Sequence, residues 1–550
     1  MNINMNMKLF TVHAGTRRRL GTVAAALGIA IAATAVPASS ATQSTSTAST
    51  TTATLDPASI DRFVRDYLEQ TRLPGAVVAV TKGDRVVHTA GYGHTAAGQA
   101  MTERTRLPVA SLSKSMTALA VMQLVEAGEV DLDQPVRRYL PEFTMADGRS
   151  QEITVRQVLT QTSGMADSAY PDLTRAQPHS LQEAVAAMRE AHLATAPGTG
   201  YRYHNPNYFV AARLVEVVSG QPFADYLSAK LFDPLHMTHT ASVDTTTEMP
   251  DQARGYVRAY GTTFSRAHPR WFTAGGHGVV TTADDLSQWL IAQNNQGVSA
   301  DGRRIATART IRLTHTPPKV PGDTDYAMGW ARYRHGDGTE EIQHNGQLLT
   351  HNSTATLLPD DKVGIAVVTN TGLISGDDAA QITLGLVDLA RGKSPEVAKP
   401  FSMTADWVLA ALTLLAAGLG VRGVLRARRW ARHTARRPWW RTALRLLPQA
   451  LPVLLLTQLA SLLGLLMNRS GTFAQATYAW PALVVCAAAG ALASTSVVTA
   501  RALALFRQRQ QPRHGAGAGA GAGGDEGDTP LGAGDPESAA PLKIESASPC

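Results

Sequence analysis

The sequence predicts a mixed α/β (α+β) fold in which one antiparallel sheet is flanked by helices and joined to a helical subdomain, followed by three transmembrane helices. Strand-like runs occur near residue 80 and again between 326 and 369, with helical patterns between them, so distant segments must complete one sheet. Three long apolar segments follow residue 400. We expect the folded domain to cover residues 57–392.

The first 41 residues have the pattern of a secretory signal peptide. A basic stretch at 17–19 precedes an apolar run that ends in small residues, and cleavage is expected after Ala38 or Ala41. The arginines also resemble a twin-arginine signal, although weakly. Residues 42–56 are rich in Ser, Thr and Ala and predict a flexible linker.

Local patterns predict the elements of the folded domain in order. Asp56 and Pro57 begin a helix whose apolar residues recur at helical spacing. Two strands at 76–80 and 86–89 form a hairpin around a Lys-Gly-Asp turn. Helices dominate from 113 to about 290, strands are expected at 326–333, 341–347, 354–358 and 363–369, and a closing helix follows at 377–390.

The apolar segments predict transmembrane helices at 405–425, 446–468 and 478–500. The connecting loop 426–445 is strongly basic, whereas the loop after the second span carries only Arg469. By the positive-inside rule, the basic loop and the tail 501–550 are cytoplasmic and the folded domain is extracytoplasmic. We therefore expect a multi-pass protein of the cell membrane with a disordered tail; the alternative is a buried helical domain.

The net charge of +7 is compatible with nucleic-acid binding, but its distribution argues against it. Residues 422–513 contain 14 arginines and no Asp, Glu or Lys, so the basic charge flanks the apolar segments and the rest of the chain is acidic. We expect no nucleic-acid partner. The two cysteines, Cys486 and Cys550, leave the exported part without a disulfide, so a large core must stabilise it.

The segment ASLSKSMTALAVMQLVEAG, residues 110–128, predicts an almost wholly apolar helix with one cation near its start. Such a helix is normally buried, and burial favours the neutral form of a lysine such as Lys114. Ser111 stands three residues earlier, on the same helix face. The pair has the arrangement of a nucleophile and its base. The alternative is a snorkelling lysine beside an N-capping serine.

Two further short motifs lie downstream. Tyr203-His204-Asn205 precedes a helix on a loop, and His344-Asn345-Gly346 lies on a predicted strand. With Ser-x-x-Lys, these motifs resemble those of the serine β-lactamase and penicillin-binding-protein superfamily, in its class C and DD-peptidase-like branch. The resemblance covers about residues 57–392 and includes ITVRQVLTQTSGM at 153–165 and GGHGVVTTADDL at 275–286. It implies a β-lactamase/transpeptidase-like fold.

The resemblance implies an acyl-transfer site that needs no cofactor and no metal. Ser111 would attack the carbonyl carbon, and Lys114 would take the serine proton directly or through Tyr203. Tyr203 would then pass the proton to the leaving nitrogen. How Lys114 and Tyr203 share the general-base role stays open.

The same resemblance assigns the substrate-binding residues. Asn205 would hold Lys114 and a substrate amide, and His344 would line the substrate side near a carboxylate or polar group. The backbone N–H groups of Ser111 and of Gln347, which follows Gly346, would form the oxyanion hole. A packed strand histidine is the alternative for His344.

The chain departs from the family pattern at three positions. Gln161 stands where a structural His is usual, and His204 fills the middle of Tyr-x-Asn, where a small residue is commoner and the site floor would be wider. His344 replaces the Lys of the third motif, which resembles the peptidase and esterase members. An efficient β-lactamase is therefore less expected.

The layout of signal, one such domain and three C-terminal spans resembles membrane-tethered D-amino peptidases of the colibactin-activating type, which remove an N-acyl-D-asparagine cap from a lipid-linked precursor. It implies a serine hydrolase that cleaves an amide bond next to a D-amino acid, in a small peptide or an acylated, lipid-linked substrate, with membrane lipid as a partner. The alternatives are an esterase or weak β-lactamase, and a non-catalytic cell-envelope sensor. The loop 469–477 is expected to lie close to the folded domain.

Overall fold

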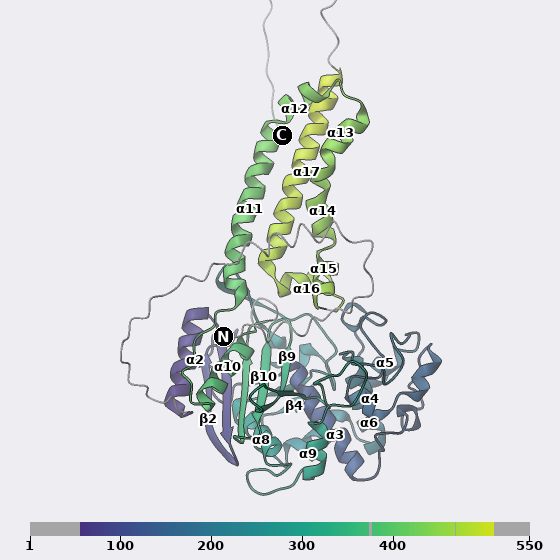
Figure 1. Ribbon diagram of the computed structural model, residues 1–550, viewed down its shortest axis with the longest axis vertical. Helices are drawn as coiled ribbons and strands as arrows, with labels where there is room; N and C mark the ends of the chain where they lie inside the picture. Colours follow the sequence, from purple (N-terminus) through teal and green to yellow (C-terminus); the bar gives the residue numbers. More distant parts are fainter. Residues whose placement is uncertain (1–54, 373–376, 468, 511–550) are drawn as a thin grey trace, which may run out of the picture. The chain divides into compact units, whose positions relative to one another are not determined.

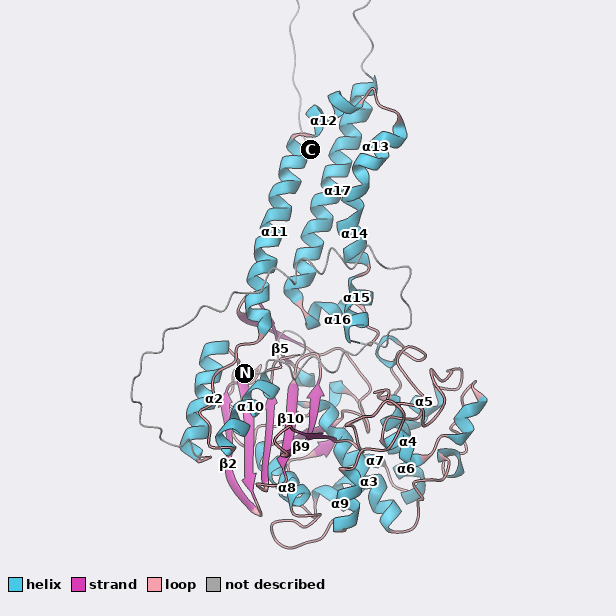
Figure 2. Cartoon of the chain, viewed as in Figure 1, coloured by secondary structure: helices cyan, strands magenta, loops and turns pink. Residues whose placement is uncertain are grey.

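The computed structural model describes residues 55–372, 377–467 and 469–510. The predicted signal peptide, most of the predicted linker and the tail beyond residue 510 lie outside the described residues. The fold class expected from the sequence is confirmed, since an antiparallel sheet is combined with many helices and followed by apolar helices (Figure 2).

The central sheet has six strands in the order β2-β1-β11-β10-β9-β8, and every neighbouring pair is antiparallel. Ala76 on β1 lies opposite Thr369 on β11, so the two ends of the domain meet in the middle of the sheet (Figure 1). The strands are β1 Gly75–Lys82, β2 Arg85–Gly93, β8 Ala331–Arg334, β9 Glu340–Gln347, β10 Asn352–Leu358 and β11 Val363–Thr369.

Strand β1 is buried on both faces, and its side chains alternate between two cores. Val78 and its neighbours pack with the helices α2 Pro57–Thr71 and α10 Asp378–Ala390. Val77 and Ala79 belong to the larger core, together with Trp289 of α8 Ala283–Asn294. The sheet is therefore covered by helices on both sides.

The helical subdomain packs around helix α3 Ser113–Glu126, which is buried on nearly every side. Its apolar set includes Met116, Leu119 and Val121. The other helices are α4 Val155–Leu159, α5 Leu181–Ala186, α6 Pro206–Ser219, α7 Phe223–Leu227 and α9 Ala308–Thr314. Short strands join them: β3 Leu107–Pro108, β4 Ala241–Ser242, β7 Val279–Thr281 and the hairpin of β5 Gly255–Ala259 with β6 Thr262–Arg266.

The strand expected at 326–333 is wrong over its first half, because only 331–334 forms β8. The chain before β8 instead turns tightly against α3. Gly329 has φ of 73°, and a Cβ there would lie 2.6 Å from Lys114 O. A glycine is needed for this close approach, which brings Tyr326 towards the active site.

Two helices, α11 Phe401–Leu425 and α17 Pro481–Gln510, are long and apolar enough to cross a membrane. A third span forms if the bent pair Trp439–Thr457 and Leu459–Leu465 crosses as one unit. The structure shows neither a membrane nor the side on which each loop lies. The positive-inside orientation therefore stays a prediction.

The second apolar segment differs from the continuous helix expected at 446–468. It is divided into α13 Trp439–Leu446, α14 Ala450–Thr457 and α15 Leu459–Met467, with a bend of 61° between the last two. Thr457 Oγ1 donates to Leu454 O at 3.0 Å, a back-bond that bends helices. Helix α12 Ala427–Thr434 lies in the basic loop, and helix α16 Phe473–Ala479 precedes α17. Helix α17 continues past residue 500, the expected end of the third span.

Candidate active site

Ser111 lies in a short turn directly before helix α3, rather than inside the helix as the sequence suggests. The turn Ala110–Leu112 is 3₁₀-helical, and Ala110 has φ of 50°, a left-handed conformation that costs about 1–3 kcal/mol. The Ser113 hydroxyl holds the turn, because it donates to Ala110 O at 2.6 Å and accepts from the Val279 N–H at 3.0 Å. The turn presents Ser111 at the start of α3.

Lys114 is fully buried on the first turn of α3, with 0% of its surface exposed. Its Nζ lies 3.1 Å from Ser111 Oγ. It also lies 3.0 Å from Asn205 Oδ1 and 2.8 Å from Gly276 O. The structure therefore brings together the first motif and the asparagine of the second.

These contacts decide which proton Lys114 can take. Burial holds the pKa of Lys114 well below its usual value, and the positive charge of Arg469 lowers it further. A neutral amine has two N–H donors and one lone pair. Because Asn205 Oδ1 and Gly276 O only accept hydrogen bonds, they engage both donors, and the lone pair is left for the Ser111 hydroxyl. Lys114 is thus placed to act as the base for Ser111.

Tyr203 is hydrogen-bonded to Ser111. Burial raises the pKa of Tyr203 to about 12, and the hydrogen bond with Ser111 opposes part of that rise. The phenol therefore stays protonated at neutral pH. Its ring centre is 5.0 Å from Lys114 Nζ, so Ser111, Lys114 and Tyr203 form one cluster.

Strand β9 brings the third motif to the Ser111 turn. A Cβ at Gly346 would lie 2.1 Å from Val109 O, so only glycine permits this approach. Strand β8 pairs with β9 only as far as Gln343. Beyond Gln343, the edge of β9 that faces away from β10 has no strand partner among the described residues. Gln347 ends the strand, and its N–H and that of Ser111 remain the predicted oxyanion donors.

His344 is buried in the wall of the site and is electrically neutral at physiological pH. Burial lowers the pKa of His344 to about 3. Its Nδ1 lies 2.8 Å from Asn345 O and its Nε2 lies 3.3 Å from the Tyr326 hydroxyl. Both ring nitrogens therefore have protein partners, and the polar neighbour of His344 is Tyr326.

Asn205 contacts Lys114 as expected, but its amide nitrogen contacts a protein carboxylate rather than facing the substrate side alone. Asn205 Nδ2 donates to Asp172 Oδ2 at 3.1 Å, and Asp172 in turn contacts the guanidinium of Arg469. The sequence reasoning missed Asp172 and Tyr326, which lie in no recognisable motif. Arg469 is visible in the sequence only as the single arginine between the last two apolar segments, a signal that bears on topology.

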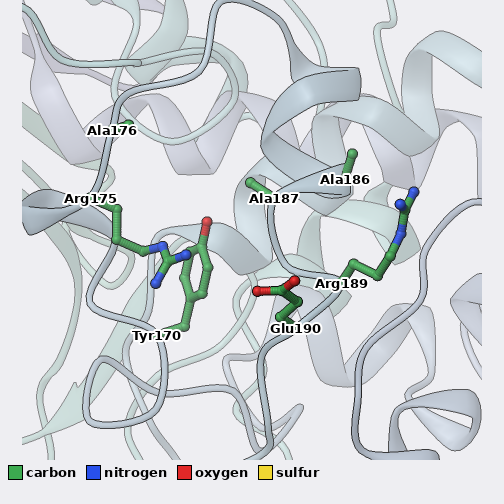
Figure 3. Close-up of a pocket in the computed structure, with 7 residues that line it drawn as sticks. All are labelled: Tyr170, Arg175, Ala176, Ala186, Ala187, Arg189 and Glu190. Atoms are coloured by element: carbon green, nitrogen blue, oxygen red, sulfur yellow. The ribbon is translucent and has the colours of Figure 1, made fainter.

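A separate cavity of about 560 Å³ opens near this region (Figure 3). It is lined by Tyr170, Arg175, Ala176, Ala186, Ala187, Arg189 and Glu190, and the predicted catalytic residues do not line it. Its one connection to the second motif is Tyr170, whose backbone oxygen lies 2.8 Å from His204 Nε2. This cavity is therefore separate from the candidate site around Ser111.

Comparison with known proteins agrees with this geometry. The family profile described as Beta-lactamase matches residues 60–390, more than half of the chain. The chain belongs to the beta-lactamase family. Members of the beta-lactamase family are generally serine hydrolases, and the Ser-x-x-Lys nucleophile is their shared feature.

Individual relatives of the beta-lactamase family give the same picture. Penicillin-binding protein 4 of Amycolatopsis lactamdurans is 31% identical over 345 residues, covering 60% of this chain and 89% of that protein. Protein flp of Staphylococcus aureus (strain N315) is 27% identical over 318 residues, 56% of this chain and 62% of flp. The chain thus spans less than two thirds of the length of flp.

A solved structure shows the fold alone. The octameric penicillin-binding protein homologue from Pyrococcus abyssi superposes with a TM-score of 0.53 at 24% identity, covering 64% of this chain and 81% of that chain. The superposition supports the sheet and helix arrangement of the beta-lactamase family, and it carries no information on the substrate.

Proposed function

We propose that this protein is a membrane-anchored serine hydrolase that cleaves an amide bond next to a D-amino acid through an acyl-enzyme on Ser111. Its catalytic domain lies on the extracytoplasmic side. The substrate is a small peptide or an N-acylated amino-acid amide, free or linked to a lipid.

One observation carries the proposal: a fully buried lysine whose Nζ lies 3.1 Å from the Ser111 hydroxyl, with acceptors engaging its other hydrogens. A buried amine of this kind is a base at neutral pH, because burial disfavours its charged form. Tyr203 adds a second group that exchanges a proton with Ser111. A serine with these neighbours is an activated nucleophile.

The reaction follows in two halves. The Ser111 oxygen forms a bond to the substrate carbonyl carbon while its proton goes to Lys114, directly or through Tyr203. The carbon–nitrogen bond then breaks, and Tyr203 returns the proton to the leaving nitrogen. A water molecule then attacks the carbonyl carbon of the acyl-enzyme and gives a proton to Lys114, directly or through Tyr203. The bond from this carbon to the Ser111 oxygen breaks, the proton goes to that oxygen, and the acid is released. Two backbone N–H donors, of Ser111 and Gln347, stabilise the oxyanion in each half, a contribution of roughly 3–4 kcal/mol for a single donor in comparable hydrolases.

The substrate class rests on the layout of the chain. A predicted export signal, one catalytic domain and C-terminal apolar helices support a site beside a membrane, where cell-wall peptides and acylated precursors would be its substrates. The neutral His344 supplies no cation for binding a β-lactam carboxylate. The neutral His344 therefore favours amide substrates without a free carboxylate at that position over β-lactams.

Ester hydrolysis is the second candidate, and the orientation of Asn205 favours it. The amide nitrogen of Asn205 donates to Asp172, and its oxygen accepts from Lys114. Asn205 is therefore less available to recognise the substrate amide than expected from the family pattern. An ester substrate does not need that contact.

A labelling experiment tests the proposal. The full-length protein in detergent is incubated with a fluorescent fluorophosphonate and with a fluorescent penicillin, beside the Ser111→Ala variant. We expect wild-type Ser111 to be labelled and Ser111→Ala to stay unlabelled with an unchanged melting curve. If neither probe labels the wild-type protein, the chain is a non-catalytic binding protein or sensor.

The substrate is then identified by rates on D-Ala-D-Ala peptides, N-acyl-D-Asn amides, the matching L-amides and simple esters. The proposal predicts that D-amides are cleaved faster than their L-counterparts. Equal rates on both, with esters faster than either, would establish the second candidate instead.

A further inference from the structure

Arg469 connects the C-terminal apolar segment to the active site. It follows α15, whose end turns back so that the Arg469 N–H donates to Gly464 O at 2.8 Å. Its guanidinium lies 3.4 Å from Asp172 Oδ1 and 3.3 Å from Asp172 Oδ2. The side chain of Arg469 is 27% exposed and that of Asp172 is 6% exposed, so the pair is largely desolvated.

Asp172 continues the connection to the base. Its Oδ2 accepts from Asn205 Nδ2, and Asn205 Oδ1 accepts from Lys114. A carboxylate has no donor, so it fixes the NH₂ side of Asn205 towards itself and the carbonyl side towards Lys114. One continuous line of charged and hydrogen-bonded groups therefore runs from Arg469 through Asp172, Asn205 and Lys114 and ends at Ser111.

Residues 469–480, which we call the docking loop, are held against the catalytic domain by several other contacts. The Ser470 N–H donates to Asp167 Oδ2 at 2.6 Å, and Gln475 Nε2 donates to Leu173 O at 2.9 Å. On the far side, the Arg266 guanidinium donates to Thr477 O at 2.9 Å. The segment that follows Arg469 is thus fixed to the catalytic domain at three positions.

Arg469 and Asp172 act on Lys114 with opposite signs. The positive charge of Arg469 disfavours a protonated Lys114, whereas the negative charge of Asp172 favours it. The other titratable groups around Lys114 are uncharged at neutral pH, because burial raises the pKa of each tyrosine and lowers the pKa of each histidine. They are Tyr203, Tyr208, His277 and His344.

We infer that Arg469 and Asp172 are positioning residues of the active site: Asp172 orients Asn205 towards Lys114, and the docking loop supplies the charge that balances Asp172. The inference rests on the proposed function, because it assigns Arg469 and Asp172 to the same hydrolytic site. It means that the membrane segment contributes a residue to the catalytic apparatus. The alternative is that the pair only fastens the docking loop to the domain.

The two roles differ in the pH profile of Ser111 acylation. Lys114 must be neutral to act, so acylation falls as the pH drops through the pKa of Lys114, which gives the profile an acidic limb. Arg469→Gln removes a positive charge and should move this limb to higher pH, by about one pH unit. Asp172→Asn keeps a hydrogen-bond acceptor but removes the negative charge, and should move the limb to lower pH. A mere fastening role moves neither limb.

The measurement is the second-order rate of fluorophosphonate labelling of the full-length protein in detergent, from pH 4 to 10. Arg266→Gln is the matched control: the same substitution, on a residue that also fastens the docking loop, but outside the line to Lys114. We expect its profile to match the wild type. Arg469→Lys keeps the charge and should also retain the wild-type limb.

The possible outcomes separate the two proposals. The positioning role is supported if the acidic limb moves to higher pH in Arg469→Gln, moves to lower pH in Asp172→Asn and does not move in Arg266→Gln. This holds even if the first two variants are less stable than the wild type. Wild-type labelling with the same limb in all variants overturns this role and leaves the proposed function intact. Absence of wild-type labelling at every pH overturns the proposed function, and the positioning role with it.

Discussion

At the residue scale, the environment of Lys114 determines the direction of proton transfer. Two of its three partners are carbonyl oxygens, which accept and never donate, so the Ser111 hydroxyl is the partner that can supply a proton. Replacing Lys114 by methionine keeps an unbranched, apolar stem of nearly the same length but removes the amine. The substitution separates proton transfer from packing.

For Lys114→Met we expect kcat to fall by about 10²–10⁴-fold, the usual contribution of general-base catalysis, with little change in substrate affinity. The measurement compares burst-phase acylation with the equilibrium binding of a substrate analogue, in Lys114→Met and in wild type. Equal losses of acylation and of binding would contradict the role of Lys114 as a base.

The sequence predicts Ser111, Lys114, Tyr203 and Asn205 as a group because each lies in a short motif whose order along the chain is informative. The structure places these four side chains together. The loop 469–477 is expected near the domain, but the sequence does not identify the contacts that matter: Asp172 reaches the site through Asn205, and Arg469 reaches it by packing on Asp172, almost 300 residues earlier. Such long-range contacts leave no local pattern.

At the element scale, the spacing between strand β9 and the Ser111 turn depends on Gly346. A Cβ at this position would meet Val109 O at 2.1 Å, and neither backbone can yield without moving the other. The strand carries the predicted oxyanion donor of Gln347, so any displacement moves this donor away from the reacting carbonyl.

Gly346→Ala should therefore lower acylation of Ser111 by about 10²-fold, because a displacement near 1 Å has an effect of this size. Gly336→Ala in the preceding turn is the control, because a Cβ there meets nothing within 4 Å. Comparable labelling rates for Gly346→Ala and Gly336→Ala would show that the approach of β9 is not catalytic.

Helix α10 is joined to α2 and β5 by a buried ion pair. The Arg258 guanidinium lies 3.1 Å from both oxygens of Asp378, which also accepts from the Tyr67 hydroxyl at 3.0 Å. Arg258 is 1% exposed and Asp378 is 0% exposed. Removing one partner leaves an uncompensated charge in the core.

We predict that Asp378→Ala lowers the free energy of unfolding by about 3–5 kcal/mol, measured by denaturant titration of the full-length protein. The double variant Arg258→Leu with Asp378→Leu should be less destabilised than Asp378→Ala. A single variant as stable as wild type would exclude a structural role for the pair.

The sequence predicts most elements of the central sheet because hydrophobic alternation and turn residues are local signals. Strand β11 has the boundaries expected, and β1 and β2 form the hairpin around Gly83. The strand expected at 326–333 is half wrong, since Met328 packs into the large core and Tyr326 packs against Tyr203 and His344 instead of continuing the sheet. The bend near Thr457 could likewise not be predicted, because the residues around it form a uniformly apolar run.

At the scale of the whole molecule, the apolar helices stand next to the domain that carries the site, and a polar link through α11 adds to the contacts of the docking loop. Asp406 of α11 accepts hydrogen bonds from the Trp480 indole at 2.7 Å and from the Tyr260 N–H at 2.8 Å. A single helix would be enough for anchoring. We propose that the additional helices receive the acyl chain of an amphiphilic substrate.

We therefore predict that the full-length protein in lipid vesicles cleaves a long-chain N-acyl substrate faster than a short-chain one, by at least about tenfold. A protein truncated after Ala398 should lose this preference. The ratio of the two rates is the measure, because loss of Arg469 in the truncated protein affects both substrates alike. An unchanged ratio would mean that the helices are only an anchor.

Because β1 pairs with β11, the central sheet can be completed only late in the biosynthesis of this chain. Until residues 363–369 have been made, the hairpin of β1 and β2 has one open edge, and the side chains of α2 have no α10 to pack against. Pairing partners so distant in sequence fold late, because the loop between them must close first. Arg469 emerges later still. The ribosome therefore finishes the nucleophile, then the sheet that supports it, and lastly the arginine that lies beside Asp172, so a nascent chain holds an incomplete site until the docking loop has been synthesised.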